Sequence, residues 1–476
     1  MDRREFLKQG IAASVAIGAA STLGAAPAPA KKPNVLFVFS DEHRFQSSPG
    51  EPHSDVLAPN LAEFRRRNLS FKNCISNYPL CAPYRAILMT GRWPYQTGVI
   101  DNGIQLAADS RSLGNLFRNS GYHTGYVGKW HLSSADGRFI PEGAMRQGFE
   151  DWHVWARTNA HFDQAFTFDP TTGQKIQPHG YNCDLMTDQA VQFLQQQKLD
   201  SKPWMLMVSW NPPHPPYGDA PAEDMKLYNA DTLAMRPNVK FKNHGNGVLG
   251  SAAGLRNAQH GYYSHISGVD KQFGRLLRTL EATGQADNTI VIYTSDHGDM
   301  MGSHTYMGKR LPWEESCRVP FFIRYPGVTA QGLEINMLFS TVDIYPTLCG
   351  LAGISVPDHC AGKDLSAAMR GGKVDAPESA FVMHISKAGA EERQMNNAPL
   401  FRAVRTPRYT YAVAEDGRWL LYDNQEDPYQ MKNLIDDPAR KALLSDLDGV
   451  ALDWLKKASD PFPYAATVTK RSKEAS

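Results

Sequence analysis

A cysteine stands where a helix is predicted to begin, in the stretch CAPYRAILMTGR at residues 81–92. Apolar residues continue for more than one helical turn, Pro83 suits the first turn because no N–H is needed there, and Gly91 is a typical helix end. Cys81 would therefore lie beside free backbone N–H groups at the positive end of the helix dipole, where thiols ionise readily and anions bind. The alternative is a small buried apolar residue, the usual fate of a free cysteine.

Four short apolar runs are each followed directly by polar or ionisable residues. The runs are NVLFVFS at 34–40, HTGYVG at 123–128, WMLMVSW at 204–210 and NTIVIYTS at 288–295. Nearly continuous apolar runs of this length are typical of strands buried on both faces of a parallel sheet. Helix-like segments lie between them, at 112–121, 186–197 and 267–284. We therefore predict an α/β fold whose functional site lies at the carboxyl ends of these strands.

The side chains that follow the four runs are of types that act on anions and metals. They are Asp41, Glu42, Lys129, His131, His214, Asp296 and His297. Each has an ordinary structural explanation, since an aspartate after a strand often caps a helix and a lysine often lies in solvent. Their recurrence at four strand ends favours one shared pocket instead.

Two or three carboxylates with one histidine predict a site for a hard divalent cation with oxygen ligands. His297 widens the choice of ion toward manganese, because imidazole suits softer ions than calcium. Cationic donors around an anionic group are available from Arg85, Lys129, His131, His214 and Lys309. A metal ion within such a ring suits the charge that develops in sulfuryl or phosphoryl transfer, and Cys81 is the candidate nucleophile.

Together these motifs resemble the type I sulfatases, a family of the alkaline-phosphatase-like superfamily. The most specific part is CAPYRAILMTGR, which matches the family signature C-x-P-x-R followed by TGR. Other segments occur in the order that the family shows: NVLFVFSDE, GKWHL, NPPHPPY, SDHGDMMGSH and KRLPWEESCRVPFFIRYPG. Two later landmarks are STVDIYPTLCGLAGI at 340–354 and LYDNQEDPYQMKNL at 421–434. The resemblance thus covers nearly the whole chain beyond the N-terminal segment.

The resemblance implies an alkaline-phosphatase-like sandwich with a large, mostly parallel central sheet flanked by helices, and a small antiparallel C-terminal subdomain. It also implies that Cys81 is oxidised to formylglycine by a formylglycine-generating or sulfatase-maturating enzyme, which reads Pro83 and Arg85. One hydroxyl of the hydrated aldehyde would attack sulfur and release the alcohol. The second hydroxyl would then be deprotonated and expel sulfate, a step that a serine could not perform.

The family's roles carry over to matching positions of this sequence. The implied metal ligands are Asp41, Glu42, Cys81, Asp296 and His297, around a divalent ion that is Ca²⁺ in the first place, with Mn²⁺ and Mg²⁺ as alternatives. The implied catalytic residues are Cys81, Arg85, Lys129, His131, His214 and Lys309. The two lysines would bind sulfate oxygens, and Arg85 would steady the modified Cys81. His131 would help to collapse the sulfated intermediate, and His214 would protonate the leaving oxygen, alone or with Lys309.

One position departs from the family pattern. Many relatives have Asp-Asp after the first strand, whereas this chain has Asp41-Glu42. The longer side chain of Glu42 either reaches the metal or only orients its neighbours. Asp299 and His304 also fall near the predicted site, where a loop-capping role is at least as reasonable as a catalytic one.

The first 30 residues predict an export signal of the twin-arginine type. The segment RREFLK precedes a charge-free run rich in alanine and glycine, which ends in APAPA. An uncleaved membrane anchor is the weaker interpretation, because alanine and glycine contribute little to insertion. We expect a periplasmic or secreted protein without a stable membrane anchor, which meets the export machinery and, outside, sulfated carbohydrate substrates.

The 476 residues have a formal net charge of +1, which argues against a nucleic-acid-binding protein driven by overall charge. We predict a catalytic domain at 31–375 and a C-terminal subdomain at 376–476. A hairpin is predicted at 408–423, where two strand-like runs flank a Glu-Asp-Gly turn. The segments 152–182 and 241–262 are predicted to be long irregular loops over the site.

Two further features leave alternatives open. The six cysteines, at positions 74, 81, 183, 317, 349 and 360, show no zinc-site spacing and reveal no disulfide pairing. Five aromatic residues either pack together, which we favour, or stack on sugars; they are Trp152, Trp155, Phe162, Phe166 and Phe168.

Two rival functions are compatible with the same residues. A phosphate or phosphonate ester hydrolase of the same superfamily would use a similar metal and aldehyde. A non-catalytic sulfated-glycan-binding protein would result if Cys81 were never modified. The preference for sulfated polysaccharides or oligosaccharides as substrates rests on the family and on export.

Overall fold

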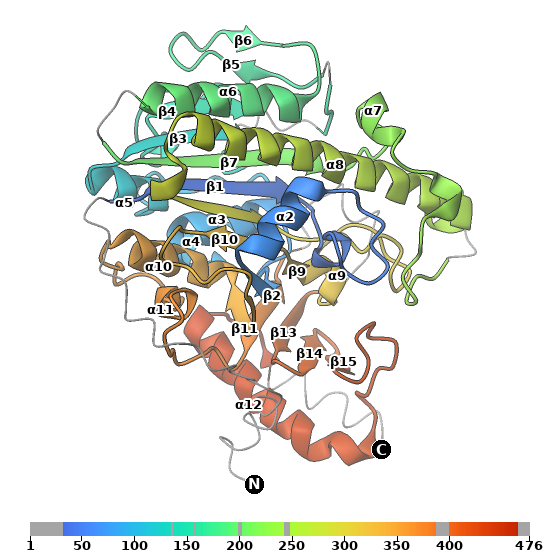
Figure 1. Ribbon diagram of the computed structural model, residues 1–476. Helices are drawn as coiled ribbons and strands as arrows, with labels where there is room; N and C mark the ends of the chain where they lie inside the picture. The colour runs from blue at the N-terminus through green and yellow to red at the C-terminus, as the bar shows by residue number, and fades with distance from the viewer. Residues whose placement is uncertain are drawn as a thin grey trace.

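The computed structural model describes residues 32–134, 137–155, 159–162, 164–198, 202–241, 248–386 and 399–464. The predicted export signal at 1–30 lies outside them. The described chain forms a large mixed sheet covered by helices and a small antiparallel sheet close to the C-terminus (Figure 1). This arrangement confirms the predicted α/β fold. Within the described residues, no helix combines the length and apolar character needed to cross a bilayer.

The large sheet is built from β1 Asn34–Asp41, β2 Leu69–Ile75, β3 His123–Lys129, β4 Asp151–Trp155, β5 Thr167–Phe168, β6 Lys175–Ile176, β7 Trp204–Pro213, β8 Thr289–Ser295, β9 Arg318–Val319, β10 Phe321–Arg324 and β11 Glu334–Ser340. The small sheet is built from β12 Ala380–His384, β13 Phe401–Arg405, β14 Tyr409–Ala414 and β15 Gly417–Asp423. The α-helices are α2 Pro59–Arg67, α3 Cys81–Thr90, α4 Pro94–Thr97, α5 Leu113–Asn119, α6 Asn182–Gln197, α7 Ala222–Met225, α8 Ala252–Ala282, α9 Glu314–Cys317, α10 Thr341–Ala352, α11 Ser366–Met369 and α12 Lys441–Ala458. Short 3₁₀ turns are η1 Phe45–Ser47, η2 Ala144–Arg146, η3 Ala230–Thr232, η4 Val248–Gly250, η5 Ala286–Asn288 and η6 Pro438–Arg440.

The four strands predicted from the apolar runs lie next to one another in the large sheet, in the order β8-β1-β7-β3 (Figure 1). All four are parallel, with Val35 of β1 paired to Met205 of β7 and Ile290 of β8. β10 is inserted antiparallel between β8 and β2, which makes the sheet mixed. Because the four central strands are parallel, their carboxyl ends meet at one edge, as the sequence predicts.

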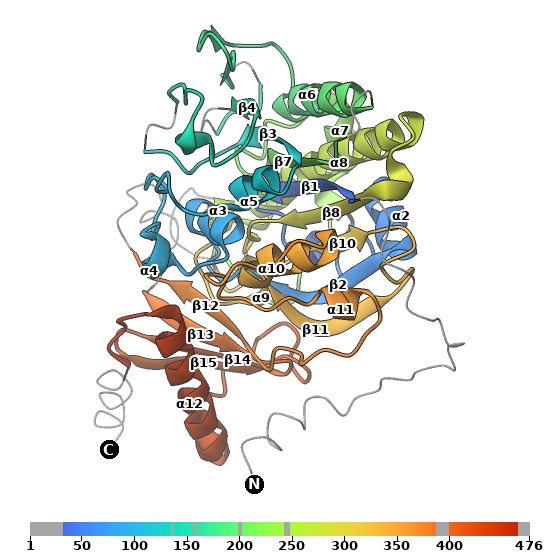
Figure 2. The same cartoon turned by 90° about the vertical axis from the view of Figure 1, so that its left-hand side faces the viewer.

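Side chains of β1 alternate between two apolar layers. Val35, Phe37 and Phe39 pack into a core with α3, α5 and α10, whereas Leu36 and Val38 pack into a second core with α2, α6 and α8. The two sets of helices cover opposite faces of the sheet (Figure 2). Burial on both faces explains why this strand is an unbroken apolar run.

Helix α3 begins at Cys81, as predicted, and ends at Gly91. Gly91 has φ 62°, a left-handed conformation that glycine adopts without strain, and its N–H donates to the carbonyl of Ile87. Every residue of the helix is buried. The helix is therefore held firmly on the sheet, with its first residue at the edge where the central strands end.

The two segments predicted as long irregular loops differ from that prediction. α8 begins at Ala252, and the shorter helix predicted at 267–284 is its C-terminal half. Its first turns contain Gly254 and Gly261, which weaken the helix signal in the sequence; Gly261 is needed because a Cβ there would lie 1.9 Å from the carbonyl oxygen of Tyr217. The segment 152–182 contains most of β4 and also β5 and β6, which extend the large sheet at its edge.

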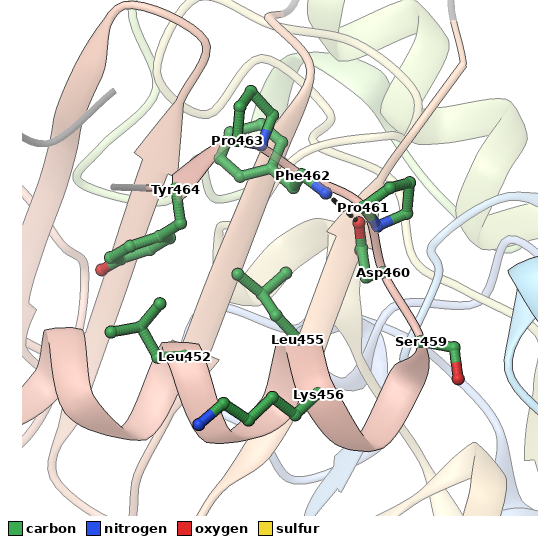
Figure 3. A pocket seen from close by; sticks show the side chains of 9 residues that line it. All are labelled: Leu452, Leu455, Lys456, Ser459, Asp460, Pro461, Phe462, Pro463 and Tyr464. Atoms are coloured by element: carbon green, nitrogen blue, oxygen red, sulfur yellow. Dashed lines mark hydrogen bonds between the residues drawn. The ribbon is translucent and has the colours of Figure 1, made fainter. Parts of the chain in front are cut away.

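The small sheet has the strand order β12-β13-β14-β15, and β14 and β15 form the hairpin predicted at 408–423. Helix α12 packs against it (Figure 1). An apolar groove lies beside the end of this helix, between Leu452 and Leu455 on one side and Phe462 and Tyr464 on the other (Figure 3). None of the predicted site residues lines this groove. The domain boundary after residue 375 stays a prediction.

Candidate active site

The side chain of Cys81 lies at the centre of the residues predicted from the strand ends. Its Sγ is 3.3 Å from Nε2 of His297 and 3.3 Å from Nζ of Lys309. Oδ1 of Asp41 is 3.7 Å away and Nζ of Lys129 is 3.9 Å away. The thiol is therefore surrounded by one carboxylate, one imidazole and two ammonium groups, and it is 1% exposed.

Four side chains could hold a metal ion together. Ligand atoms of Asp41, Cys81, Asp296 and His297 all lie within 4.8 Å of one another, and all four residues are buried. Nδ1 of His297 is 3.1 Å from the carbonyl oxygen of Gly298, to which it donates in the tautomer that leaves Nε2 facing the cluster. Two carboxylates, one imidazole and one further ligand fit a divalent cation, so this donor set is consistent with the metal that the sequence predicts.

Arg85 joins the two carboxylates of this cluster. Its Nη2 is 3.0 Å from Oδ2 of Asp41 and 3.2 Å from Oδ2 of Asp296. Its Nη1 donates to the carbonyl of Lys129 and to Oγ of Ser209, each at 2.6 Å. One guanidinium thus contacts the last residues of β1 and β3, Ser209 within β7 and the residue after β8, and so links the four central strands.

The two carboxylates are electrostatically unequal. Burial raises the pKa of Asp41, but neighbouring cations, with Lys129 foremost and Lys309 and Arg85 beside it, outweigh burial and lower it well below its usual range. Burial and the neighbouring charge of Asp41 raise the pKa of Asp296 to about 6. Like charges buried side by side repel, and a divalent cation between them would remove that repulsion.

Cys81 differs from the other cysteines in its acidity. Burial and Asp41 raise the pKa of Cys81, but Lys129, Lys309 and His297 outweigh them and lower it to about 5. Burial raises the pKa of the other five thiols, at positions 74, 183, 317, 349 and 360. The six cysteines are free thiols, and only Cys81 is held in a cationic pocket.

Glu42 and His214 lie on the lysine side of the cluster. Oε2 of Glu42 is 3.1 Å from Nζ of Lys309 and 3.5 Å from Nε2 of His214. Glu42 is absent from the group of four ligands, but it forms a second group with Asp41 and His214 whose atoms also lie within 4.8 Å. Burial raises the pKa of Glu42 to about 8. Metal ligation by Glu42 therefore stays a prediction.

The proton state of His214 follows from its surroundings. Burial, Lys309 and Lys129 lower the pKa of His214 well below its usual range, so the imidazole is neutral. Its Nδ1 is 2.7 Å from the carbonyl oxygen of Pro215 and donates to it, which leaves Nε2 facing the site. His131, two residues after Lys129, is buried with φ 56°.

Asp299 and His304 organise the loop after β8. Oδ1 of Asp299 accepts N–H groups from Met301 and Gly308, at 2.7 Å and 2.9 Å. The ring of His304 stacks on Trp313, with ring centroids 4.9 Å apart. The Asp299 contacts support a loop-capping role, and the His304 contact is a packing contact.

Among the aromatic residues of 152–168, the two tryptophans are buried. Trp152 packs against Tyr126 and Trp130, and Nε1 of Trp155 donates to Gln189 at 3.0 Å. The packing interpretation is confirmed for these two. Phe162, Phe166 and Phe168 are half-buried.

Sequence reasoning missed several residues that contact the cluster or the backbone beside it. They are Ser209, Asp101, Asn102 and Arg310. Asp101 and Asn102 precede Gly103 and have the sequence pattern of a surface turn. Ser209 is one polar residue within an apolar strand. No local signal in the sequence marks Ser209, Asp101 or Asn102 as neighbours of the site, whereas Arg310 directly follows the predicted Lys309.

The sequence profile of the family described as Sulfatase matches residues 33–354 of this chain. The chain belongs to the sulfatase family. This finding confirms the family predicted from the C-x-P-x-R motif, and it makes the chain a sulfuric ester hydrolase. A second profile, described as N-sulphoglucosamine sulphohydrolase, C-terminal, matches residues 302–456.

Relatives cover nearly the whole of this sulfatase. It is 34% identical to an ulvan-active sulfatase of Formosa agariphila over 436 residues, which are 90% of this chain and 82% of the relative. It is 28% identical to an endo-4-O-sulfatase of Bacteroides thetaiotaomicron, with 91% of this chain and 94% of the relative covered. A crystal structure of a putative sulfatase from Bacteroides fragilis matches with a TM-score of 0.81 and 28% identity, covering 90% of this chain and 97% of that one.

Proposed function

We propose that this chain is an exported, periplasmic or secreted sulfatase that hydrolyses sulfate esters of a sulfated polysaccharide or oligosaccharide. It would use two groups for catalysis: a formylglycine made from Cys81, and a divalent metal ion. The observation that carries the proposal is the position of Cys81, whose Sγ lies 3.3 Å from both His297 and Lys309. Residue 81 thus stands between a cluster of metal-ligating types and a pair of lysines that suit an anionic ester.

The metal ion is proposed to be held by Asp41, Asp296, His297, residue 81 and, by the family pattern, Glu42. Such an ion would supply Lewis-acid polarisation of an ester oxygen and would lower the pKa of a hydroxyl beside it. Ca²⁺ is our first choice because carboxylates outnumber the imidazole, with Mn²⁺ and Mg²⁺ as alternatives. Arg85 keeps the two aspartates in place by binding one oxygen of each.

Conversion of Cys81 to formylglycine requires a partner enzyme, a formylglycine-generating or sulfatase-maturating enzyme. Cys81, Pro83 and Arg85 are all buried in the folded chain. A second enzyme cannot reach a segment that is covered on every side. We therefore expect the conversion to take place before folding is complete, and the sequence motif itself to be the recognition element.

Lys129 and Lys309 are proposed to bind the sulfate oxygens, since both ammonium groups point at residue 81. Charge-assisted hydrogen bonds from two lysines would also stabilise the charge that gathers on sulfate during transfer. His131 is proposed to take a proton as the sulfated intermediate collapses.

His214 is proposed to deliver a proton to the leaving oxygen from Nε2. The imidazole is neutral because burial, together with Lys309 and Lys129, lowers its pKa well below the usual range. A bound sulfate ester brings negative charge to the same place, which favours the protonated ring. Nε2 is the atom that faces the site, so the proton would be delivered in the required direction.

The proposed substrate class rests on two supports. One relative is named for action on ulvan and another as an endo-4-O-sulfatase. The predicted export signal would bring this chain to carbohydrate outside the cytoplasm.

The test compares 4-nitrophenyl sulfate with 4-nitrophenyl phosphate, using protein from a host that makes formylglycine. The proposal predicts faster turnover of the sulfate ester, loss of turnover in Cys81→Ala, and loss on removal of divalent ions with restoration by Ca²⁺. Faster turnover of the phosphate ester would instead support the phosphate or phosphonate ester hydrolase. Binding of sulfated oligosaccharides without turnover of either ester would support the non-catalytic binding protein.

A further inference from the structure

Two consecutive side chains after α4 bind the chain neighbours of two proposed catalytic residues. Oδ1 of Asn102 accepts the backbone N–H of Ala82 at 3.1 Å. Oδ1 of Asp101 is 2.7 Å from Nη2 of Arg310. Ala82 follows Cys81, and Arg310 follows Lys309. The dipeptide Asp101-Asn102 therefore binds next to both residues whose Sγ and Nζ atoms are in contact, Cys81 and Lys309.

The two attachments are coupled to each other. The backbone N–H of Asn102 donates to Oδ1 of Asp101 at 2.8 Å, so the two side chains share one turn. The backbone N–H of Arg310 donates to the carbonyl of Pro79 at 3.0 Å, two residues before Cys81. The segments around residues 81 and 309 are therefore joined both directly and through the dipeptide.

Arg310 has a backbone conformation that needs such support. Its φ is 68°, which is unfavourable for a residue with a side chain and persists only where surrounding contacts impose it. Besides Asp101, its guanidinium contacts Nε2 of His384 at 3.4 Å and donates to the carbonyl of Ser386 at 3.2 Å. These contacts hold Arg310 while Lys309 faces Cys81.

We propose that Asp101 and Asn102 are positioning residues that set the distance between residue 81 and the ammonium group of Lys309. The inference rests on the proposed function, because it assigns these residues to the alignment of the sulfate-binding lysine with the residue at 81. Asp101 is 2% exposed and paired with a buried arginine, so its orientation is well determined. Asn102 acts through the backbone N–H of Ala82, and Asp101 acts through the side chain of Arg310.

The first test is kinetic. In Asn102→Ala the N–H of Ala82 loses its acceptor, and in Asp101→Asn the charge that holds Arg310 is removed. We expect kcat/KM on 4-nitrophenyl sulfate to fall about 10- to 100-fold, as for other supporting contacts around a reaction site. At the same time, KM and the inhibition constant of inorganic sulfate are expected to rise, because the misplaced lysine binds sulfate less tightly. Asn102→Asp still has an acceptor oxygen for the N–H of Ala82, so this variant is expected to keep most of the wild-type activity.

Controls separate positioning from loss of folded protein. Asp448→Asn removes a carboxylate of α12 that binds Arg418 of β15 at 2.5 Å, a more exposed pair than Asp101 and Arg310, and is expected to leave KM and sulfate inhibition unchanged. A smaller folded fraction lowers the apparent kcat but leaves both of those constants unaltered. The formylglycine content of the peptide 73–85 is measured in every variant and is expected to equal that of the wild type.

A crystal structure of Asp101→Asn, the variant that weakens the tie to Arg310 beside Lys309, provides a readout that does not depend on turnover. We expect Nζ of Lys309 to move away from residue 81 by about 1 Å, the scale at which misplacement costs activity. An unmoved lysine, or unchanged KM and sulfate inhibition in both variants, would overturn the proposal. If the wild type is inactive on every sulfate ester and the lysine still moves, the proposed function fails while the positioning role stands.

Discussion

Glu314 carries a buried ion pair that joins α9 to the C-terminal sheet. Its Oε1 is 2.7 Å from Nε of Arg405 in β13, and its Oε2 is 3.0 Å from Nη1 of Arg318. Burial raises the pKa of Glu314, but Arg405 and Arg318 outweigh burial and lower it from the usual 4.5 to about 2. Glu314→Gln is neutral at every pH. We predict that its loss of stability will measure how much the Glu314 charge contributes to the free energy of unfolding.

The size of the effect follows from the difference in pKa. A fall from 4.5 to about 2 corresponds to roughly 3 kcal/mol of stability, at 1.36 kcal/mol for each pKa unit. A depressed pKa in the folded state means that this stability is present above the unfolded pKa and is lost as the pH falls through 4.5 toward 2. At pH 3 about 2 kcal/mol of it should be gone, because the unfolded chain is already protonated there while the folded chain is not.

The assay is urea unfolding of wild type and Glu314→Gln at several pH values between 7 and 3. The difference between the two proteins is expected to be about 3 kcal/mol at pH 7 and about 1 kcal/mol at pH 3. Glu63→Gln is the matched control, because Glu63 also pairs with two arginines but lies at the surface. Its free energy of unfolding is expected to equal that of the wild type at each pH. A difference for Glu314→Gln that stays constant with pH would refute the reasoning.

Three further predictions concern the site. Asp296→Ala is expected to lose at least about 100-fold in activity and most of its bound metal, while circular dichroism shows a folded protein; near-normal metal content would remove Asp296 from the ligands. His214→Ala is expected to lower desulfation of glycans far more than hydrolysis of nitrophenyl sulfate, because a sugar hydroxyl needs a proton to leave and nitrophenol does not. Equal losses on both substrates would leave His214 as a binding residue. In the tryptic peptide 73–85 of active protein, Cys81 is expected as an aldehyde that reacts with a hydrazide, and Cys74 as an alkylatable thiol; an alkylatable Cys81 throughout active material would contradict the formylglycine mechanism.

Local sequence determined the parts of the fold that depend on nearby residues. The central strands were predictable because a strand buried on both faces must be apolar along its whole length, as β1 is. The start and end of α3 were predictable because Pro83 and Gly91 have strong positional preferences. Where the local signal was weak, as in the first turns of α8 with their two glycines, the prediction was wrong, since tertiary packing rather than propensity forms the helix there.

The residue types proposed for the site follow from the sequence, but their arrangement does not. The types of Asp41, Asp296 and His297, each at the end of an apolar run, are enough to indicate a metal site. The order β8-β1-β7-β3 and the bridging of two carboxylates by Arg85 exist only in the folded chain. The tie from Asp101 to Arg310 spans more than two hundred residues and leaves no periodic or local trace. Sequence patterns report which face of an element is buried, whereas contacts between distant elements depend on how those faces pack against each other, and only the tertiary structure decides that.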